Sequence, residues 1–92
     1  PRPALVEFLD GGRISGTGGC NRFSGGFTRS GEILEFSPVV STRMACLSET
    51  AQQLENQFLG LLQGRLAWKA AESRLELRNA EGEIILVFDR QL

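Results

Sequence analysis

Histidine is absent from this 92-residue chain, and lysine occurs once, at Lys69. A structural zinc site needs four Cys or His ligands, and the chain has only two cysteines. A papain-like thiol nucleophile needs a His base, which the chain also lacks. The glycine-rich residues 16–26 do not contain the G-x-x-x-x-G-K-[ST] pattern of a phosphate-binding loop. We therefore expect no enzymatic activity, no metal and no cofactor.

A surplus of charge of one sign is lacking as well. The chain has ten Lys and Arg residues and eleven Asp and Glu residues, which gives a net charge of −1. Phosphate binding needs a basic face, so we expect no nucleic-acid partner. The longest apolar run, residues 84–88, falls far short of the roughly 20 residues of a membrane-spanning helix. We expect membrane association only through an anchor outside this chain.

The length of the chain predicts one domain over residues 1–92 with a modest core. Short segments rich in β formers, separated by Gly, Asn and Ser turns, predict strands. These segments are residues 4–9, 13–17, 27–29, 32–36, 66–70, 74–78 and 83–89. Residues 18–26 are expected to form a glycine-rich loop, and residues 39–46 an irregular connection.

One helix is predicted after the irregular connection. Apolar residues recur there at steps of three and four, which places them on one helical face: Leu47, Ala51, Leu54, Phe58, Leu61 and Leu62. Ser48 or Thr50 can cap its start, and Gly64 can end it in a left-handed conformation. The expected fold is therefore α+β and mostly antiparallel, a curled sheet or partly open barrel with one helix packed against it.

Cys20 and Cys46 are the only cysteines, and their number alone fits either a reduced or an oxidised pair. No C-x-x-C redox motif is present. With zinc and His-activated chemistry excluded, a structural disulfide is the favoured role. By the chain-entropy model it would stabilise the domain by about 3.5 kcal/mol. An oxidised pair also favours the periplasm or cell surface.

Three segments around these cysteines have a recognisable pattern. Residues 16–25 read GTGGCNRFSG, residues 41–46 read STRMAC, and residues 55–62 read ENQFLGLL. They resemble, in this order, the signature G-x-x-G-C-N-x-F-x-G, the T-x-M-A-C segment and the E-x-x-F-L-x-x-L helix of the META domain family. That family includes the bacterial heat-shock protein HslJ and many predicted envelope lipoproteins. The family usually begins with a strand carrying W-x-L, which nothing before Pro1 supplies, so we expect one sheet edge to be open or filled by a neighbouring chain.

The resemblance implies paired cysteines, a β-rich fold with one helix, and an extracytoplasmic location in the periplasm or outer membrane of a bacterium. It implies a role connected with heat shock or antibiotic resistance rather than an established catalytic activity. A likeness of the family to a lipid-binding pilot protein also implies an apolar groove. The groove could be floored by Trp68 together with Phe23, Phe27, Phe36 and Phe58, although the small size of the domain favours core as the role of most of these aromatics.

Four polar residues that flank the cysteines form the candidate interaction surface: Asn21, Arg22, Thr42 and Arg43. An Arg side chain can recognise a carboxylate or another anion. The alternative is structural, with Asn21 bonding to its own loop backbone, Thr42 satisfying loop groups and Met44 filling core. The favoured function is a non-catalytic envelope interaction module with an unknown protein partner. A lipid or hydrophobic-ligand carrier is the second hypothesis, and a protease-inhibitor-like or chaperone-like binder is the third.

Overall fold

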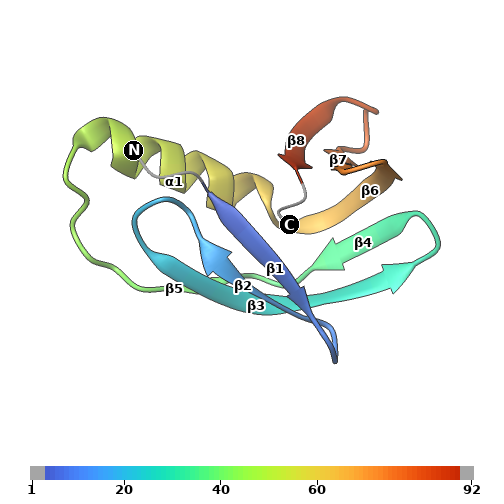
Figure 1. The fold of residues 1–92 in the computed structure, drawn as a ribbon, viewed down its shortest axis with the longest axis horizontal. Helices are drawn as coiled ribbons and strands as arrows, with labels where there is room; N and C mark the ends of the chain where they lie inside the picture. Colours follow the sequence, from blue (N-terminus) through green and yellow to red (C-terminus); the bar gives the residue numbers. More distant parts are fainter. Residues whose placement is uncertain (1–3, 90–92) are drawn as a thin grey trace.

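A computed structural model describes residues 4–89 of the chain, which form eight strands and one helix (Figure 1). The strands before the helix are β1 (Leu5–Leu9), β2 (Arg13–Thr17), β3 (Arg22–Ser30), β4 (Ile33–Phe36) and β5 (Val40–Ser41). The helix is α1 (Glu49–Leu61), and it is followed by β6 (Gly64–Ala71), β7 (Arg74–Arg78) and β8 (Ile84–Asp89). No helix in this described part is long and apolar enough to cross a membrane.

Every strand pair is antiparallel, and the order across the sheet is β1-β2-β3-β4-β6-β7-β8, with β5 added beside β3. The sheet curls into a half-barrel with the single helix beside it (Figure 1). The predicted α+β fold class is therefore confirmed. Within the described residues β1 and β8, which end the main path of the sheet, each pair on one side only, so both ends of that path are open edges; the short β5 also pairs on one side only, with β3.

Strand β3 belongs to both halves of the sheet. Its first half, from Arg22 to Gly26, pairs with β2, whereas its second half, from Phe27 to Ser30, pairs with β4. The prediction of a loop throughout residues 18–26 was therefore wrong beyond residue 21. Glycine is weak in strands, but here the small residue is needed for close packing. A Cβ on Gly25 would lie 3.1 Å from the Val39 side chain.

Helix α1 begins after Ser48, whose side chain accepts a hydrogen bond from the Ala51 N–H at 3.1 Å. Ser48 is thus the cap, and Thr50 lies inside the helix. Gly64 has the expected positive φ of 73° but opens β6 three residues after the helix ends. The predicted apolar face was partly wrong, because three of its leucines are exposed: Leu47, Leu54 and Leu61. The buried face instead contains Glu55.

The core is small, and aromatic contacts join the helix to both halves of the sheet. Phe58 of α1 packs against Phe23 of β3, with ring centroids 5.9 Å apart, and against Phe88 of β8, at 6.1 Å. Trp68 does not join a groove floor with these rings. Its Nε1 donates to the Gly31 carbonyl, and Arg29 stacks over its ring. The buried apolar residues are Ile14, Phe23, Leu34, Phe36, Leu62, Leu66 and Leu77.

Candidate functional site

The loop between β2 and β3 meets helix α1 at a buried carboxylate. Glu55 is 2% exposed, and its Oε2 accepts hydrogen bonds from the backbone N–H groups of Cys20, at 2.9 Å, and Asn21, at 2.5 Å. Its Oε1 accepts from the Asn21 Nδ2 at 2.8 Å. Both oxygens of Glu55 are thus satisfied by a single short loop.

Glycine allows this close approach. A Cβ built on Gly18 would lie 2.5 Å from the Cγ of Glu55, closer than real Cβ contacts occur. The loop also holds itself together, because the Gly18 N–H donates to the Asn21 carbonyl and the Gly19 N–H donates to the Thr17 Oγ1, each at 3.1 Å. The glycines before Cys20 therefore shape a cradle of N–H donors for a carboxylate from within the chain.

Two opposing effects set the charge of Glu55. Burial disfavours the ionised form and raises the pKa of the carboxyl. Hydrogen bonds from the Asn21 backbone, the Asn21 side chain and the Cys20 backbone together outweigh it, so the pKa of Glu55 lies below its ordinary value. The carboxylate is therefore ionised at neutral pH and already engaged by donors, which makes it a poor general acid or base.

Asn21 connects this carboxylate to the loop that follows β5. Its Oδ1 accepts from the Thr42 Oγ1 at 2.9 Å and from the Met44 N–H at 2.8 Å. Its Nδ2 donates to the Met44 carbonyl at 3.2 Å as well as to Glu55. Every donor and acceptor of the side-chain amide is used, so Asn21 joins three segments that are distant in the sequence.

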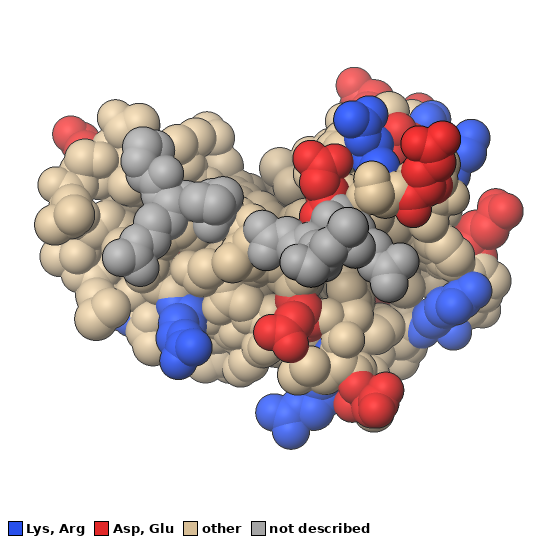
Figure 2. All heavy atoms as spheres, viewed as in Figure 1, with Lys and Arg blue, Asp and Glu red and all other residues tan. Residues whose placement is uncertain are grey.

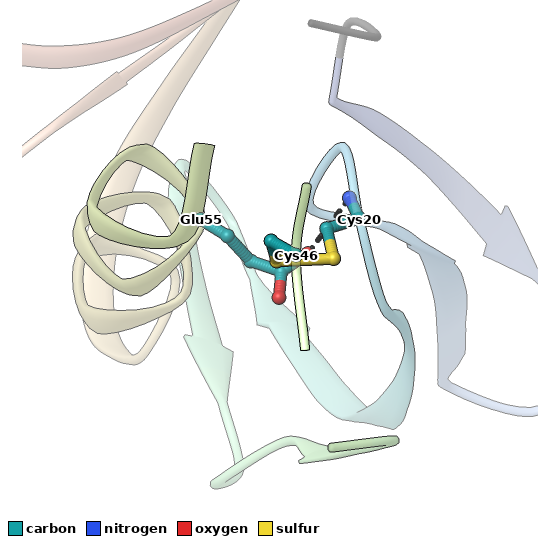
Figure 3. Close-up of side chains that lie close together, drawn as sticks. All are labelled: Cys20, Cys46 and Glu55. Carbon is teal, nitrogen blue, oxygen red and sulfur yellow. Dashed lines mark hydrogen bonds between the residues drawn. A yellow bond between two sulfur atoms is a disulfide. The ribbon is translucent and has the colours of Figure 1, made fainter. Parts of the chain in front are cut away.

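The disulfide between Cys20 and Cys46 lies against the same group (Figure 3). The two sulfur atoms and a carboxylate oxygen of Glu55 lie within 4.8 Å of one another. Two thiolates and a carboxylate are a ligand set for a soft metal, but the oxidised pair offers no thiolate and Glu55 is held by its donors. We call Asn21, Thr42, Met44, Glu55 and the disulfide the Asn21–Glu55 cluster.

The four residues predicted as an interaction surface occupy different places. Asn21 is 2% exposed, so it lies inside the cluster and not on a surface. Thr42 is exposed, but its hydroxyl donates to Asn21 and accepts from the Arg22 N–H at 3.2 Å. The side chains of Arg22 and Arg43 are exposed. Asn21 therefore has a structural role, but its side chain bonds to Glu55, Thr42 and Met44 and not to its own loop backbone as expected. Thr42 satisfies a loop N–H as expected while it remains exposed, and Arg22 and Arg43 are accessible. Met44 is 63% exposed and does not fill core.

Sequence reasoning missed Glu55 as a site residue. A signal was present, because Glu55 lies four residues after Ala51 and three before Phe58, on the apolar side of the helix. A carboxylate at such a position requires buried donors. The pattern did not show where those donors come from, since Cys20 and Asn21 lie 35 and 34 positions away.

A wide cleft of about 1520 Å³ opens between the first strands of the sheet and β7–β8. Apolar side chains on both sides contribute to its walls, among them Val6, Phe23, Leu75 and Phe88. Arg22 and Thr42 also line it, which places two of the predicted surface residues at the cleft. On the opposite wall, the Nε of Arg74 lies 3.7 Å from the Oδ1 of Asp89, and the two side chains form an exposed ion pair.

Comparison with known proteins now assigns the chain to a family. The family model of the META domain matches residues 1–91. The chain belongs to the META domain family. Two structures solved by NMR are similar to it. One is 28% identical, with a TM-score of 0.66, over 86% of this chain and 67% of its own. The other, from Burkholderia xenovorans, is 30% identical, with a TM-score of 0.67, over 86% of this chain and 55% of its own. None of the curated proteins matches this META domain.

The family assignment accounts for the residues of the Asn21–Glu55 cluster. Segments resembling the family signature supply Cys20 and Asn21 from one loop, and Thr42, Met44 and Cys46 from the next. The third segment begins with Glu55. Because these three segments converge on one buried polar cluster, we interpret the signature of this META domain as a set of contacts that stabilise the fold.

Proposed function

We propose that this META domain is a non-catalytic binding module of the bacterial cell envelope, which takes an extended segment of a partner polypeptide in the cleft between β1 and β8. The observation that carries the proposal is the pair of open edges beside the cleft. An unpaired strand edge presents free N–H and C=O groups, which an extended peptide can pair with.

The side chains of the edge strands support this mode of binding. Five of the large apolar residues that are at least 40% exposed lie on the two edge strands: Leu5, Phe8 and Leu9 on β1, and Ile84 and Val87 on β8. Side chains that alternate along a partner strand would contact such residues from the open side. Arg22 and Thr42 add polar groups at the cleft, which favour a partner with some polar character over a purely apolar one.

The non-catalytic assignment draws on the Asn21–Glu55 cluster. Glu55 is the one buried carboxylate in the described residues, and loop donors occupy both of its oxygens. The envelope assignment draws on the disulfide, since disulfides persist in oxidising compartments. As an accessory of stress or antibiotic-resistance responses, the module would act by binding alone.

Selection of peptides from a random display library on the oxidised domain tests the proposal. We expect enriched peptides to have alternating apolar residues and to shift the amide NMR signals of β1 and β8. Val87→Lys places a charge at the cleft and should lower the affinity for these peptides about tenfold or more. Leu54→Lys is the matched control, because Leu54 is as exposed as Val87 but lies on α1 and does not line the cleft.

The proposal fails if no peptide is enriched, or if Val87→Lys does not change the affinity for the bound peptides.

A second candidate function, binding of a small lipid or other apolar ligand, is favoured by the apolar walls of the same cleft. Native mass spectrometry of the purified domain and titration with a fluorescent fatty acid distinguish the two. Stoichiometric fatty-acid binding that Val87→Lys abolishes, without peptide enrichment, would establish the carrier function instead.

A further inference from the structure

The segment that leads from β5 to α1 is held firmly while its apolar side chains face water. We call residues 42–48 the clamped loop. Asn21 bonds to both the N–H and the carbonyl of Met44, and the disulfide fixes Cys46. Ser48 ends the loop as the helix cap. Nevertheless Met44 is 63% exposed and Leu47 is fully exposed.

Single exposed apolar residues are ordinary on protein surfaces. What distinguishes the clamped loop is that a buried amide and a covalent bond fix the backbone that presents them. A segment fixed before binding loses little conformational freedom on binding, so contacts made by its side chains are retained as affinity. The clamped loop is therefore organised as a contact surface before any partner arrives.

The charges around the clamped loop are few and mainly positive. Between Phe36 and Glu49 the only charged residue is Arg43. Arg22 lies beside it, since the Thr42 N–H donates to the Arg22 carbonyl at 2.9 Å. Glu49, in the first helical turn, is the nearest exposed acid in sequence, whereas Glu55 is buried.

The clamped loop lies at one end of the longest axis of the molecule, and β7–β8 lie toward the other end (Figure 1). Figure 2 shows few charged side chains at the end that carries the loop, whereas charges of both signs gather over β7 and β8. On the face shown, the molecule thus has an end with few charges and a charged end.

We infer that the clamped loop rests on the surface of an anionic lipid bilayer, with Met44 and Leu47 inserted at the interface and Arg22 and Arg43 near the lipid phosphates. Apolar insertion and electrostatic attraction to anionic lipids together govern interfacial binding. The charged end, over β7 and β8, would remain in water. This contact shares Arg22 and Thr42 with the rim of the cleft, whereas Met44 and Leu47 lie outside it, and it adds to any anchor elsewhere in the protein.

A bilayer fits the side chains of this end better than a folded partner does. Anchor residues of protein interfaces are enriched in Trp, Tyr and Arg, whereas Leu is under-represented among them. The apolar contacts of the clamped loop come from Met44 and Leu47, and the whole side chain of Leu47 is exposed. A fluid interface accepts protruding apolar side chains without matching their shape, and Arg side chains can keep their charged groups among the lipid head groups.

Co-sedimentation of the oxidised protein with vesicles tests the inference. We expect binding to vesicles of phosphatidylcholine mixed with phosphatidylglycerol, weaker binding to phosphatidylcholine alone, and loss of binding at high salt. The double variant Met44→Ser, Leu47→Ser should lower the partition coefficient about tenfold or more. Arg43→Ala should lower it about fivefold at low salt.

Ile84→Ser is the matched control, because it removes an exposed apolar side chain from β8, away from the clamped loop. It should leave vesicle binding unchanged, and thermal unfolding should show that every variant is folded. Absence of vesicle binding by the unaltered protein overturns the inference, and so does an equal loss in Ile84→Ser. Detection of a folded protein partner whose binding requires Met44 and Leu47, with no vesicle binding, would assign the loop to that partner instead.

Discussion

Asn21 donates its backbone N–H to one oxygen of Glu55 and its side-chain Nδ2 to the other. A single loop residue therefore donates to both oxygens of a buried carboxylate on the only helix of the described chain. Asn21 uses its remaining oxygen to fix the clamped loop through Thr42 and Met44. The helix, the glycine-rich loop and the clamped loop are thus coupled through two side chains, and loss of either should affect all three segments.

Replacement of Glu55 by Gln should destabilise the domain by about 2 kcal/mol. The change puts an amide donor opposite the donors of Asn21 and Cys20 and removes charge-assisted hydrogen bonds. Urea unfolding of the oxidised proteins at neutral pH measures the difference. Glu49→Gln is the matched control on the same helix, where the exposed side chain should contribute less than about 1 kcal/mol. Equal effects of the two substitutions would contradict the role assigned to Glu55.

Stability should fall with acid in a way that depends on Glu55. Its pKa is lowered in the folded protein from an ordinary value of 4.5. A group with a depressed folded pKa contributes stability that is present above its unfolded pKa and is lost as the pH falls through the folded value. The gap in urea midpoint between the unaltered protein and Glu55→Gln should therefore be constant near neutral pH and narrow below pH 4.5. A gap that persists unchanged into strong acid would rule out this charge effect.

Two glycine substitutions should act in opposite directions. Gly18→Ala should destabilise by about 1–3 kcal/mol, because the added Cβ would collide with Glu55. Gly60→Ala should stabilise by about 1 kcal/mol, because Gly60 lies in α1 and a Cβ there meets nothing within 4 Å. Thermal unfolding under identical conditions compares the two variants. A stable Gly18→Ala protein would mean that the loop can move away from the helix without loss.

Strand periodicity and helix capping could be predicted from the sequence because they depend on neighbouring residues. The alternation of Leu75 and Leu77 gave β7 with its observed bounds, and Ser48 was one of the two caps considered. The glycine-rich part of β3 could not be predicted, because its strand form depends on contact with the distant Val39. Local turn preference was overridden there by pairing with β2 and β5.

The candidate site was predictable only in part for the same reason. The disulfide followed from the count of cysteines and the missing alternatives, but the burial of Asn21 did not, because its partners come from Met44 and Glu55. Apolar periodicity also placed Leu54 and Leu61 on the packed face of the helix, whereas both side chains are exposed. The helix buries a narrower face, on which Glu55 meets the loop between β2 and β3 and Phe58 packs against the sheet.

The long sequence separation within the Asn21–Glu55 cluster bears on how the chain acquires its structure. The hairpins β1–β2 and β3–β4 join neighbouring segments, so they can pair as soon as their own residues have left the ribosome or a translocation pore. The Asn21 N–H must wait for a carboxylate that follows 34 residues later. Cys20 therefore emerges as a free thiol next to an unfilled N–H cradle. Because Cys46 precedes the helix, the disulfide can form before Glu55 arrives, whereas the cradle is filled only when the helix docks. Covalent closure of the two loops can thus come before the polar contacts that they share with the helix.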